Sequence, residues 1–168
     1  MLFERVFREL NKRKIKYLVV GGIAVNLHGF SRTTGDLDLM LSFDTNNLKK
    51  FVQMVKFLGL IPTVPVAVED FMVSETRNLW EKEKNMKVFS VFNPKDRMEH
   101  VDVLIHHDVD FEKAYKNRED IPAVGLKIPV IAINDLIKMK KVAGRERDKI
   151  DIKALREIIE IKDEKKKK

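Results

Sequence analysis

The 168-residue sequence contains no cysteine, which excludes disulfide bonds, thiolate metal sites and cysteine nucleophiles. Any metal ion would have to be bound by oxygen or imidazole ligands. No apolar run approaches the ~20 residues of a membrane span, and the first ten residues carry charges where a signal peptide would be apolar. We therefore expect a cytoplasmic protein without a membrane segment.

The excess of positive charge is small once the last seven residues are set aside. The chain holds 33 Lys and Arg against 26 Asp and Glu, and residues 162–168 contribute +3 of the net +7. We predict that this basic segment is a disordered tail and that residues 1–161 form a single domain. The sequence has no basic stripe with interleaved aromatic residues, so a nucleic-acid-binding domain ranks last among the candidate functions. The charged fraction of 35% and the single glutamine resemble thermophile composition.

Short apolar strands alternate with helical patterns along the chain. We expect strands at 15–20, 36–41, 87–92, 99–105 and 128–133, and helices at 3–10, 23–27, 48–58, 111–117, 134–143 and after Gly144. Asp44 or Thr45, and later Asn134, are predicted helix N-caps. Residues 62–84 give no clear pattern. This mixture predicts an α/β (α+β) fold, a mixed β-sheet flanked by helices with a helical C-terminus.

Four of the seven glycines, Gly21, Gly22, Gly29 and Gly35, lie within fifteen residues between two predicted strands. A strand that ends in Gly21-Gly22 and leads into a helix lets backbone N–H groups approach an anion such as phosphate. A tight turn without a ligand would use the same glycine pair. The glycines alone do not decide between these two interpretations.

Three aspartates could share one patch of the sheet. Asp36 and Asp38 are two apart on a predicted strand, so their carboxylates point to the same side, about 6.5–7 Å apart, and can converge on a hard cation. Asp102 lies on a later strand that could pair with theirs. Three carboxylates this close repel one another unless cations neutralise their charge. Two Mg²⁺ ions bridged by carboxylates would neutralise it, and such a pair of ions catalyses in-line displacement at phosphorus. The alternative for Asp102 is an exposed acid on an edge strand.

Two other groups of polar residues have simpler interpretations. Asp108 and Asp110 form a second Asp-x-Asp pair beside His106 and His107, in a polar stretch that is typical of a loop or a helix N-terminus. Imidazole ligands for a metal are the less favoured alternative there. His28 precedes Gly29 and is predicted to be a buried, hydrogen-bonded histidine.

The string Val20-Gly21-Gly22, thirteen residues and then Asp36-Leu37-Asp38-Leu39 resembles the signature of the DNA polymerase β-type nucleotidyltransferase superfamily. Arg32-x-Thr34-x-Asp36 and the C-terminal Lys140 and Arg145 are similar to its small prokaryotic branch, which includes toxin-type (abortive-infection) nucleotidyltransferases. The resemblance implies that a nucleoside monophosphate moves from an NTP to an acceptor and that pyrophosphate is released.

The resemblance also implies roles for individual residues. Asp36 and Asp38 would bind two Mg²⁺ ions, with Mn²⁺ as the alternative metal, and Asp102 would bind the catalytic ion and take the acceptor's proton. Gly21 and Gly22 would hold the triphosphate. The candidate cations for nucleotide binding are Arg32, Lys140 and Arg145. Gly22 stands where many members have serine, so a side-chain hydroxyl for the phosphates is missing. Arg145, Asp148 and Asp151 could instead form an ion-pair ladder on one helix.

A second interpretation is a catalytically weak protein of the same fold that acts as a toxin-antitoxin partner or nucleotide-binding module. The missing serine favours this interpretation, and the three intact acids count against it. The acceptor, whether RNA, protein or small molecule, is not specified by the sequence. Because the chain is short, we expect a homodimer or a small partner protein to complete the acceptor surface.

Overall fold

The computed structural model describes residues 2–167 and contains one mixed β-sheet with helices packed around it. The strands are β1 (Tyr17–Val19), β2 (Asp36–Leu41), β3 (Ile61–Pro62), β4 (Val88–Asn93), β5 (Asp96–Leu104), β6 (Glu119–Ala123) and β7 (Leu126–Val130). The helices are α1 (Leu2–Lys12), α2 (Gly21–His28), α3 (Thr45–Phe57), α4 (Ser74–Lys84), α5 (Phe111–Lys116), α6 (Ile133–Ala143) and α7 (Glu146–Lys166), with a 3₁₀ helix at Val68–Met72. The predicted α/β class is confirmed.

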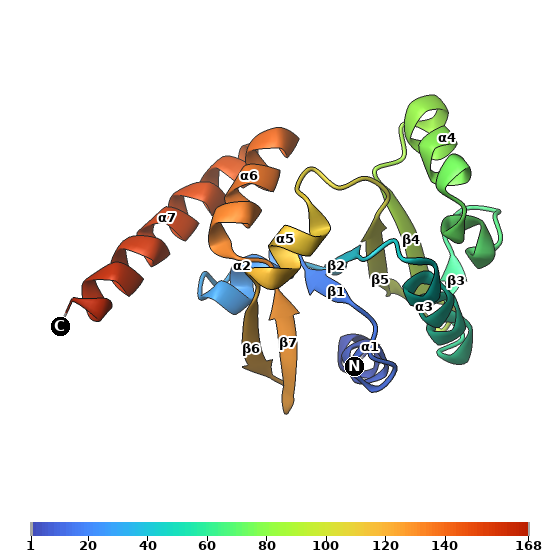
Figure 1. The fold of residues 1–168 in the computed structure, drawn as a ribbon, viewed down its shortest axis with the longest axis horizontal. Coiled ribbons are helices and arrows are strands. Elements are labelled where there is room, and N and C mark those ends of the chain that lie inside the picture. Colours follow the sequence, from blue (N-terminus) through green and yellow to red (C-terminus); the bar gives the residue numbers. More distant parts are fainter. Residues whose placement is uncertain (1, 168) are drawn as a thin grey trace.

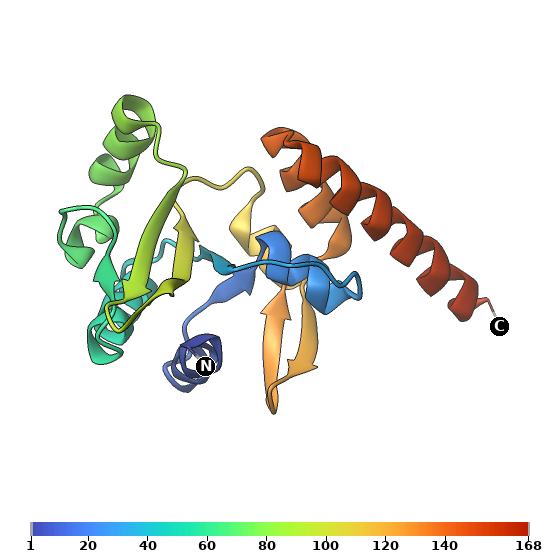
Figure 2. The ribbon, with the colours of Figure 1, turned by 180° about the vertical axis from the view of Figure 1, so that it is seen from behind.

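The strand order across the seven-stranded sheet is β3-β4-β5-β2-β1-β7-β6. β2 pairs in parallel with β5 and β1 pairs in parallel with β7, whereas β1 and β2 are antiparallel. α5 covers the face of the sheet that is nearer in Figure 1, and α2 covers the opposite face, which is nearer in Figure 2. α2 contacts both β2 and the C-terminal helices α6 and α7, so these helices lie together beside the central strands.

The alternation of apolar and polar residues in β2 and β5 determines which side chains enter the core. Leu37, Leu39, Val101 and Val103 are fully buried. Burial of each such side chain contributes about 1.5–3 kcal/mol relative to an exposed position. The residues between them project from the other face, which is where the acidic residues lie.

Three local features differ from the sequence predictions. α2 begins at Gly21, two residues before the predicted start at Ile23, with Val20 at its N-cap. α6 begins at Ile133 with Ala132 at the N-cap, so the prediction that Asn134 caps this helix is wrong. β6 was not predicted, because its sequence Glu-Asp-Ile-Pro-Ala has few apolar residues and contains Pro122.

The basic C-terminal segment is helical as far as Lys166, where the sequence predicted a disordered tail; Lys168 lies outside the described residues. Lysine and glutamate are good helix formers, and lysines in the last turn complement the helix dipole. Lys162 also forms a 3.0 Å ion pair with Glu119 of β6. α7 packs against α6 and α2 and then projects from the rest of the molecule (Figure 1). Among residues 2–167, no helix has both the length and the apolarity needed to cross a membrane.

Candidate active site

The glycine pair stands where β1 ends and α2 begins. Gly21 has a φ of +64°, in the left-handed region that favours glycine. A Cβ atom at this position would lie 2.0 Å from Oδ2 of Asp38. The same carboxylate accepts a hydrogen bond from the backbone N–H of Gly22. Glycine at position 21 therefore allows the start of α2 to approach Asp38 closely.

Asp38 and Asp102 lie side by side on neighbouring strands. In the parallel pairing of β2 and β5, Asp38 is opposite Asp102 and Asp36 is opposite His100. This register confirms the expectation that the strand of Asp102 pairs with the strand of Asp36 and Asp38. On the other side of β5, Ser90 of β4 donates a 2.6 Å hydrogen bond from its hydroxyl to Oδ1 of Asp102. Three carboxylates thus share one region of the sheet.

Burial and mutual repulsion raise the proton affinity of these carboxylates. The pKa of Asp38 is raised to about 6, mainly by burial and then by the charges of Asp102 and Asp36. The pKa of Asp102 is also raised, mainly by burial, and the hydrogen bond from Ser90 opposes this shift. A cation bound near the three carboxylates would neutralise their repulsion and lower their pKa values, which favours the ionised forms.

The carboxylates of Asp36, Asp38 and Asp102 do not converge on a single metal-binding position. Within residues 2–167, no three carboxylate or imidazole groups are arranged so that they could hold a metal ion together. Asp36 is exposed, whereas Asp38 and Asp102 are half-buried. By donor type and charge, three carboxylates fit a hard divalent cation such as Mg²⁺. Binding such an ion would require their side chains to turn toward it.

Lys140 is buried beside two aspartates of α7. Its Nζ lies 2.7 Å from Oδ2 of Asp151 and 3.3 Å from Oδ1 of Asp148, and the exposure of the three side chains is at most 4%. Burial alone would raise the pKa of Asp148, but Arg145 and Lys140 outweigh it and the pKa is lowered. The ammonium group therefore links α6 to α7 by neutralising buried acids.

The two arginines have different environments. Nε of Arg145 lies 2.9 Å from Oδ2 of Asp148, but 66% of the Arg145 side chain is exposed. Nε of Arg32 lies 3.1 Å from Oδ1 of Asp151, and the Arg32 side chain is 17% exposed. This N–H makes no hydrogen bond to any group in residues 2–167, so its contact with Asp151 is ionic only. Asp151 thus pairs with Lys140 and Arg32 and does not extend a ladder from Arg145.

All eight predicted site residues line one pocket of about 600 Å³. They are Gly21, Gly22, Arg32, Asp36, Asp38, Asp102, Lys140 and Arg145. The pocket wall also includes Thr34, Glu81, Lys87, His106 and Arg147. The arrangement combines a helix N-terminus, a cluster of carboxylates and several cations around one space. Such a space can accept an anionic ligand together with a cation.

Sequence reasoning missed the role of Ser90 as the partner of Asp102. Phe89 and Val91 are fully buried, so the alternation of β4 places Ser90 on the face that carries the acids. That pattern could have pointed to Ser90 once β4 was paired with β5. Thr34 belongs to the motif Arg32-x-Thr34-x-Asp36, but the sequence suggested no function for it.

The simpler predictions for other polar residues are confirmed. His28 is buried, and its Nε2 lies 2.7 Å from the carbonyl oxygen of Ile131. The Asp110 side chain caps α5 by accepting a hydrogen bond from the backbone N–H of Lys113. Asp44 caps α3 in the same way. These three residues therefore have structural partners.

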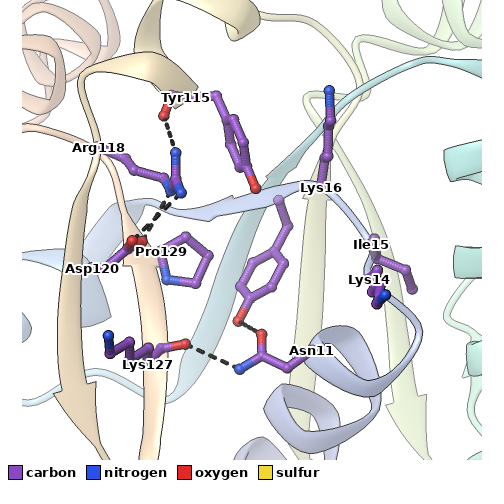
Figure 3. Close-up of a pocket in the computed structure, with 10 residues that line it drawn as sticks. Asn11, Lys14, Ile15, Lys16, Tyr115, Arg118, Asp120, Lys127 and Pro129 are labelled. Atoms are coloured by element: carbon purple, nitrogen blue, oxygen red, sulfur yellow. Dashed lines mark hydrogen bonds and ion pairs between the residues drawn. The ribbon is translucent and has the colours of Figure 1, made fainter.

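A second hollow, of about 410 Å³, lies between α1, α5, β1 and β7 (Figure 3). Figure 3 shows Tyr115 between Arg118 and Lys16. The Arg118 guanidinium lies 4.2 Å from the centre of the Tyr115 ring, and its Nε lies 2.9 Å from Oδ1 of Asp120. None of Asp36, Asp38 and Asp102 lines this hollow. The chemistry suggested by the acids therefore belongs to the larger pocket.

A family model described as "Nucleotidyltransferase of unknown function (DUF6036)" matches residues 2–163. The chain belongs to this nucleotidyltransferase family. The match includes β2, β5 and the C-terminal helix pair, so it covers every residue that lines the larger pocket. The predicted membership among nucleotidyltransferases is thereby confirmed.

Solved structures share the fold of this nucleotidyltransferase at low sequence identity. ANT(2″)-Ia in complex with adenylyl-2″-tobramycin is 12% identical, with a TM-score of 0.59 over 92% of this chain and 85% of that chain. The lincomycin-bound lincosamide antibiotic adenylyltransferase LnuA is 17% identical, with a TM-score of 0.57 over 91% and 93% of the two chains. An antigenic nucleotidyltransferase-like protein from Paracoccidioides brasiliensis is 16% identical, with a TM-score of 0.57 over 94% and 73%. No curated protein sequence matches the chain.

Proposed function

We propose that this protein is a Mg²⁺-dependent enzyme that transfers a nucleoside monophosphate from an NTP to an acceptor hydroxyl. The observation that carries the proposal is the pairing of Asp38 with Asp102 directly beside the glycine-lined start of α2. The acids offer oxygen ligands for Mg²⁺, and the helix start offers backbone N–H groups for phosphate. The family match supports nucleotidyl transfer in general.

In the proposed reaction, the acceptor oxygen forms a bond to the α-phosphorus of the NTP. The bond from that phosphorus to the oxygen that bridges to the β-phosphate breaks, and pyrophosphate leaves with the bonding electrons. Mg²⁺, or Mn²⁺ in its place, would be held by Asp36, Asp38 and Asp102 and would supply charge neutralisation at the phosphates. Two such ions are expected, as in other in-line displacements at phosphorus.

Individual residues of the chain then have distinct tasks. Asp102 is half-buried and hydrogen-bonded to Ser90, and in the proposed reaction it accepts the proton of the acceptor hydroxyl. Gly21 and Gly22 bring the start of α2 to the triphosphate, and the exposed Arg145 can contact phosphate oxygens. Lys140 is assigned a positioning role, because its ammonium group is already paired with two buried carboxylates.

The structural relatives suggest one class of acceptor to test. One relative was solved in complex with adenylyl-2″-tobramycin, and another is a lincosamide antibiotic adenylyltransferase with lincomycin bound. Among the candidate acceptors RNA, protein and small molecule, a small-molecule hydroxyl is therefore the first to test. A homodimer or a small partner protein would supply any additional acceptor surface. The toxin-antitoxin or binding-module alternative predicts NTP binding without transfer to any of these acceptors.

The test is calorimetric titration of each of the four NTPs, with and without Mg²⁺. Wild type is compared with an Asp36→Ala/Asp38→Ala variant and with a control, Asp96→Ala/Asp163→Ala, which loses the same charge at exposed positions outside the pocket. We expect Mg²⁺-dependent binding in wild type and in the control and none in the first variant. Folded wild type that binds no NTP, or equal binding by all three proteins, would contradict the proposal.

A further inference from the structure

The space beside Gly22 is already filled by two other side chains of the pocket. A Cβ atom on Gly22 would lie 2.5 Å from Oγ1 of Thr34 and 2.6 Å from Nη2 of Arg32. Real Cβ contacts essentially never fall below 3.0 Å. Unlike Gly21, Gly22 does not have a positive φ, so its backbone would accept other residues. A larger residue at this position would therefore have to displace the side chains of Thr34 and Arg32.

The loop that carries these neighbours is fixed at several points. The Asn26 side chain of α2 donates a 2.9 Å hydrogen bond to the carbonyl of Arg32 and accepts a 3.0 Å hydrogen bond from its backbone N–H. The Arg32 guanidinium is held by the buried carboxylate of Asp151. These anchors come from both α2 and α7. The position of Arg32 against Gly22 is therefore fixed by α2 and α7, and Thr34 follows two residues later in the same loop.

A hydroxyl and a guanidinium thus occupy the place where a serine side chain at position 22 would project. Both belong to the wall of the pocket that contains the three aspartates. The Arg32 Nε–H lacks a hydrogen-bond partner within residues 2–167, although the atom is buried. A hydroxyl and guanidinium N–H groups are suitable donors for phosphate oxygens. Together they offer a neutral and a charged donor at the start of one helix.

We propose that Thr34, held beside Arg32 over Gly22, donates a hydrogen bond from its hydroxyl to a β- or γ-phosphate oxygen of the NTP in place of the missing serine. The inference rests on the proposed NTP site and adds a phosphate-binding residue to it. Thr34 acts on the triphosphate and not on the base or the sugar. Arg32 supplies the accompanying positive charge.

The test compares Thr34→Val, which keeps the shape but removes the hydroxyl, with Thr34→Ser, which keeps the hydroxyl. Thr33→Val is the matched control, because Thr33 is exposed and does not line the pocket. The ligands are Mg²⁺ with an NTP, Mg²⁺ with inorganic tripolyphosphate, and the matching nucleoside monophosphate. Dissociation constants are measured by calorimetry, and thermal melting verifies that each variant is folded.

We expect Thr34→Val to bind both the NTP and tripolyphosphate about ten- to a hundredfold more weakly, as for the loss of a hydrogen bond to a charged group. Thr34→Ser and Thr33→Val should stay within about threefold of wild type, and affinity for the monophosphate should not change. Wild-type affinity in Thr34→Val, or equal weakening in Thr34→Ser, would overturn the inference while leaving the NTP site intact. Absence of NTP binding in wild type would instead refute the proposed function itself.

Discussion

The Lys140 ammonium and the Asp151 carboxylate approach to 2.7 Å where both side chains are almost completely buried. Asp151 also contacts Arg32, which lies in the loop beside the glycine pair. One buried acid on α7 is thereby shared between a helix-packing contact and a side chain of the active-site pocket. A substitution of Lys140 or Asp151 should therefore change both the stability of the protein and the geometry of the pocket.

We predict that Lys140→Ala lowers the free energy of unfolding by about 3–5 kcal/mol, the range for a buried ion pair that loses one partner. The variant removes the buried ammonium group between Asp148 and Asp151 and leaves each carboxylate with a single arginine partner. Urea denaturation at neutral pH measures this change. The control is Lys138→Ala on the same helix, whose ion pair with Asp135 involves a side chain that is 66% exposed. That control should lose less than about 1 kcal/mol. Similar losses in the two variants would show that the buried network does not stabilise the fold.

Gly21→Ala should abolish NTP binding and destabilise the protein, because the new Cβ would meet Oδ2 of Asp38 at 2.0 Å. Gly125→Ala is the matched control: its φ is +71°, close to that of Gly21, but no atom lies within 4 Å of the position of its Cβ. The left-handed backbone costs each variant about 1–2 kcal/mol. Only Gly21→Ala should lose more and also fail to bind Mg²⁺ and NTP in calorimetry. Equal binding of Mg²⁺ and NTP by Gly21→Ala and Gly125→Ala would contradict this role of Gly21.

Asp38 should make the protein less stable as pH rises. Its folded pKa of about 6 lies above the ordinary value of 3.8, so between these two pH values only the native state holds the proton. Stability therefore falls as pH increases through this window and is lower above pH 6. In a metal-free buffer, Asp38→Asn should be more stable than wild type at pH 7.5 by roughly 1–3 kcal/mol. The difference should disappear below about pH 4.

Denaturation curves of both proteins across pH 4–8 check this expectation. Mg²⁺ provides the control: it should raise the melting temperature of wild type at pH 7.5 but have little effect on Asp38→Asn, because a ligand stabilises only the protein that binds it. A variant with the same pH dependence as wild type would exclude Asp38 as the group responsible.

His28 should have the opposite pH dependence. Burial lowers its pKa below the ordinary value of 6.5, so the unfolded state takes up a proton more readily, and stability falls as pH drops below 6.5. At pH 7.5, His28→Ala should lose about 1–3 kcal/mol because the carbonyl of Ile131 loses its donor. His106→Ala, at a side chain that is 60% exposed, should change stability little. Equal stabilities of the two variants in guanidinium denaturation would contradict this role.

Much of β2 could be predicted because the pattern of its residues is unambiguous. In Asp36–Leu41, buried leucines alternate with acids, and the structure has the predicted bounds. α4 was missed for the opposite reason: only Arg77 and Trp80 of its eleven residues are buried, so the segment has a weak apolar periodicity. β6 was missed because a proline and polar residues are tolerated at the edge of a sheet, and a sequence does not reveal which strand lies there.

The sequence predicted the acids and glycines of the candidate site, but not how the side chains around them pack. The pairing of Asp38 with Asp102 followed from alternation together with a pairing of two strands that are far apart in the chain. The burial of Lys140 and the filling of the Gly22 space by Thr34 depend on how α2, α7 and the loop before β2 pack together. No local pattern contains that information, because the contacts join segments separated by many residues.

β1 lies near the middle of the sheet, and one of its two partners is made late in synthesis. Val19 pairs with Val130, and the strand that contains Val130 precedes the helices that bury Lys140. Until a ribosome has translated beyond that point, the emerging chain has a central strand with one unsatisfied edge. Contacts of such long sequence separation slow folding and expose strand edges to other chains. The edge of β1 in the growing polypeptide therefore stays open to other chains until β7 has been made.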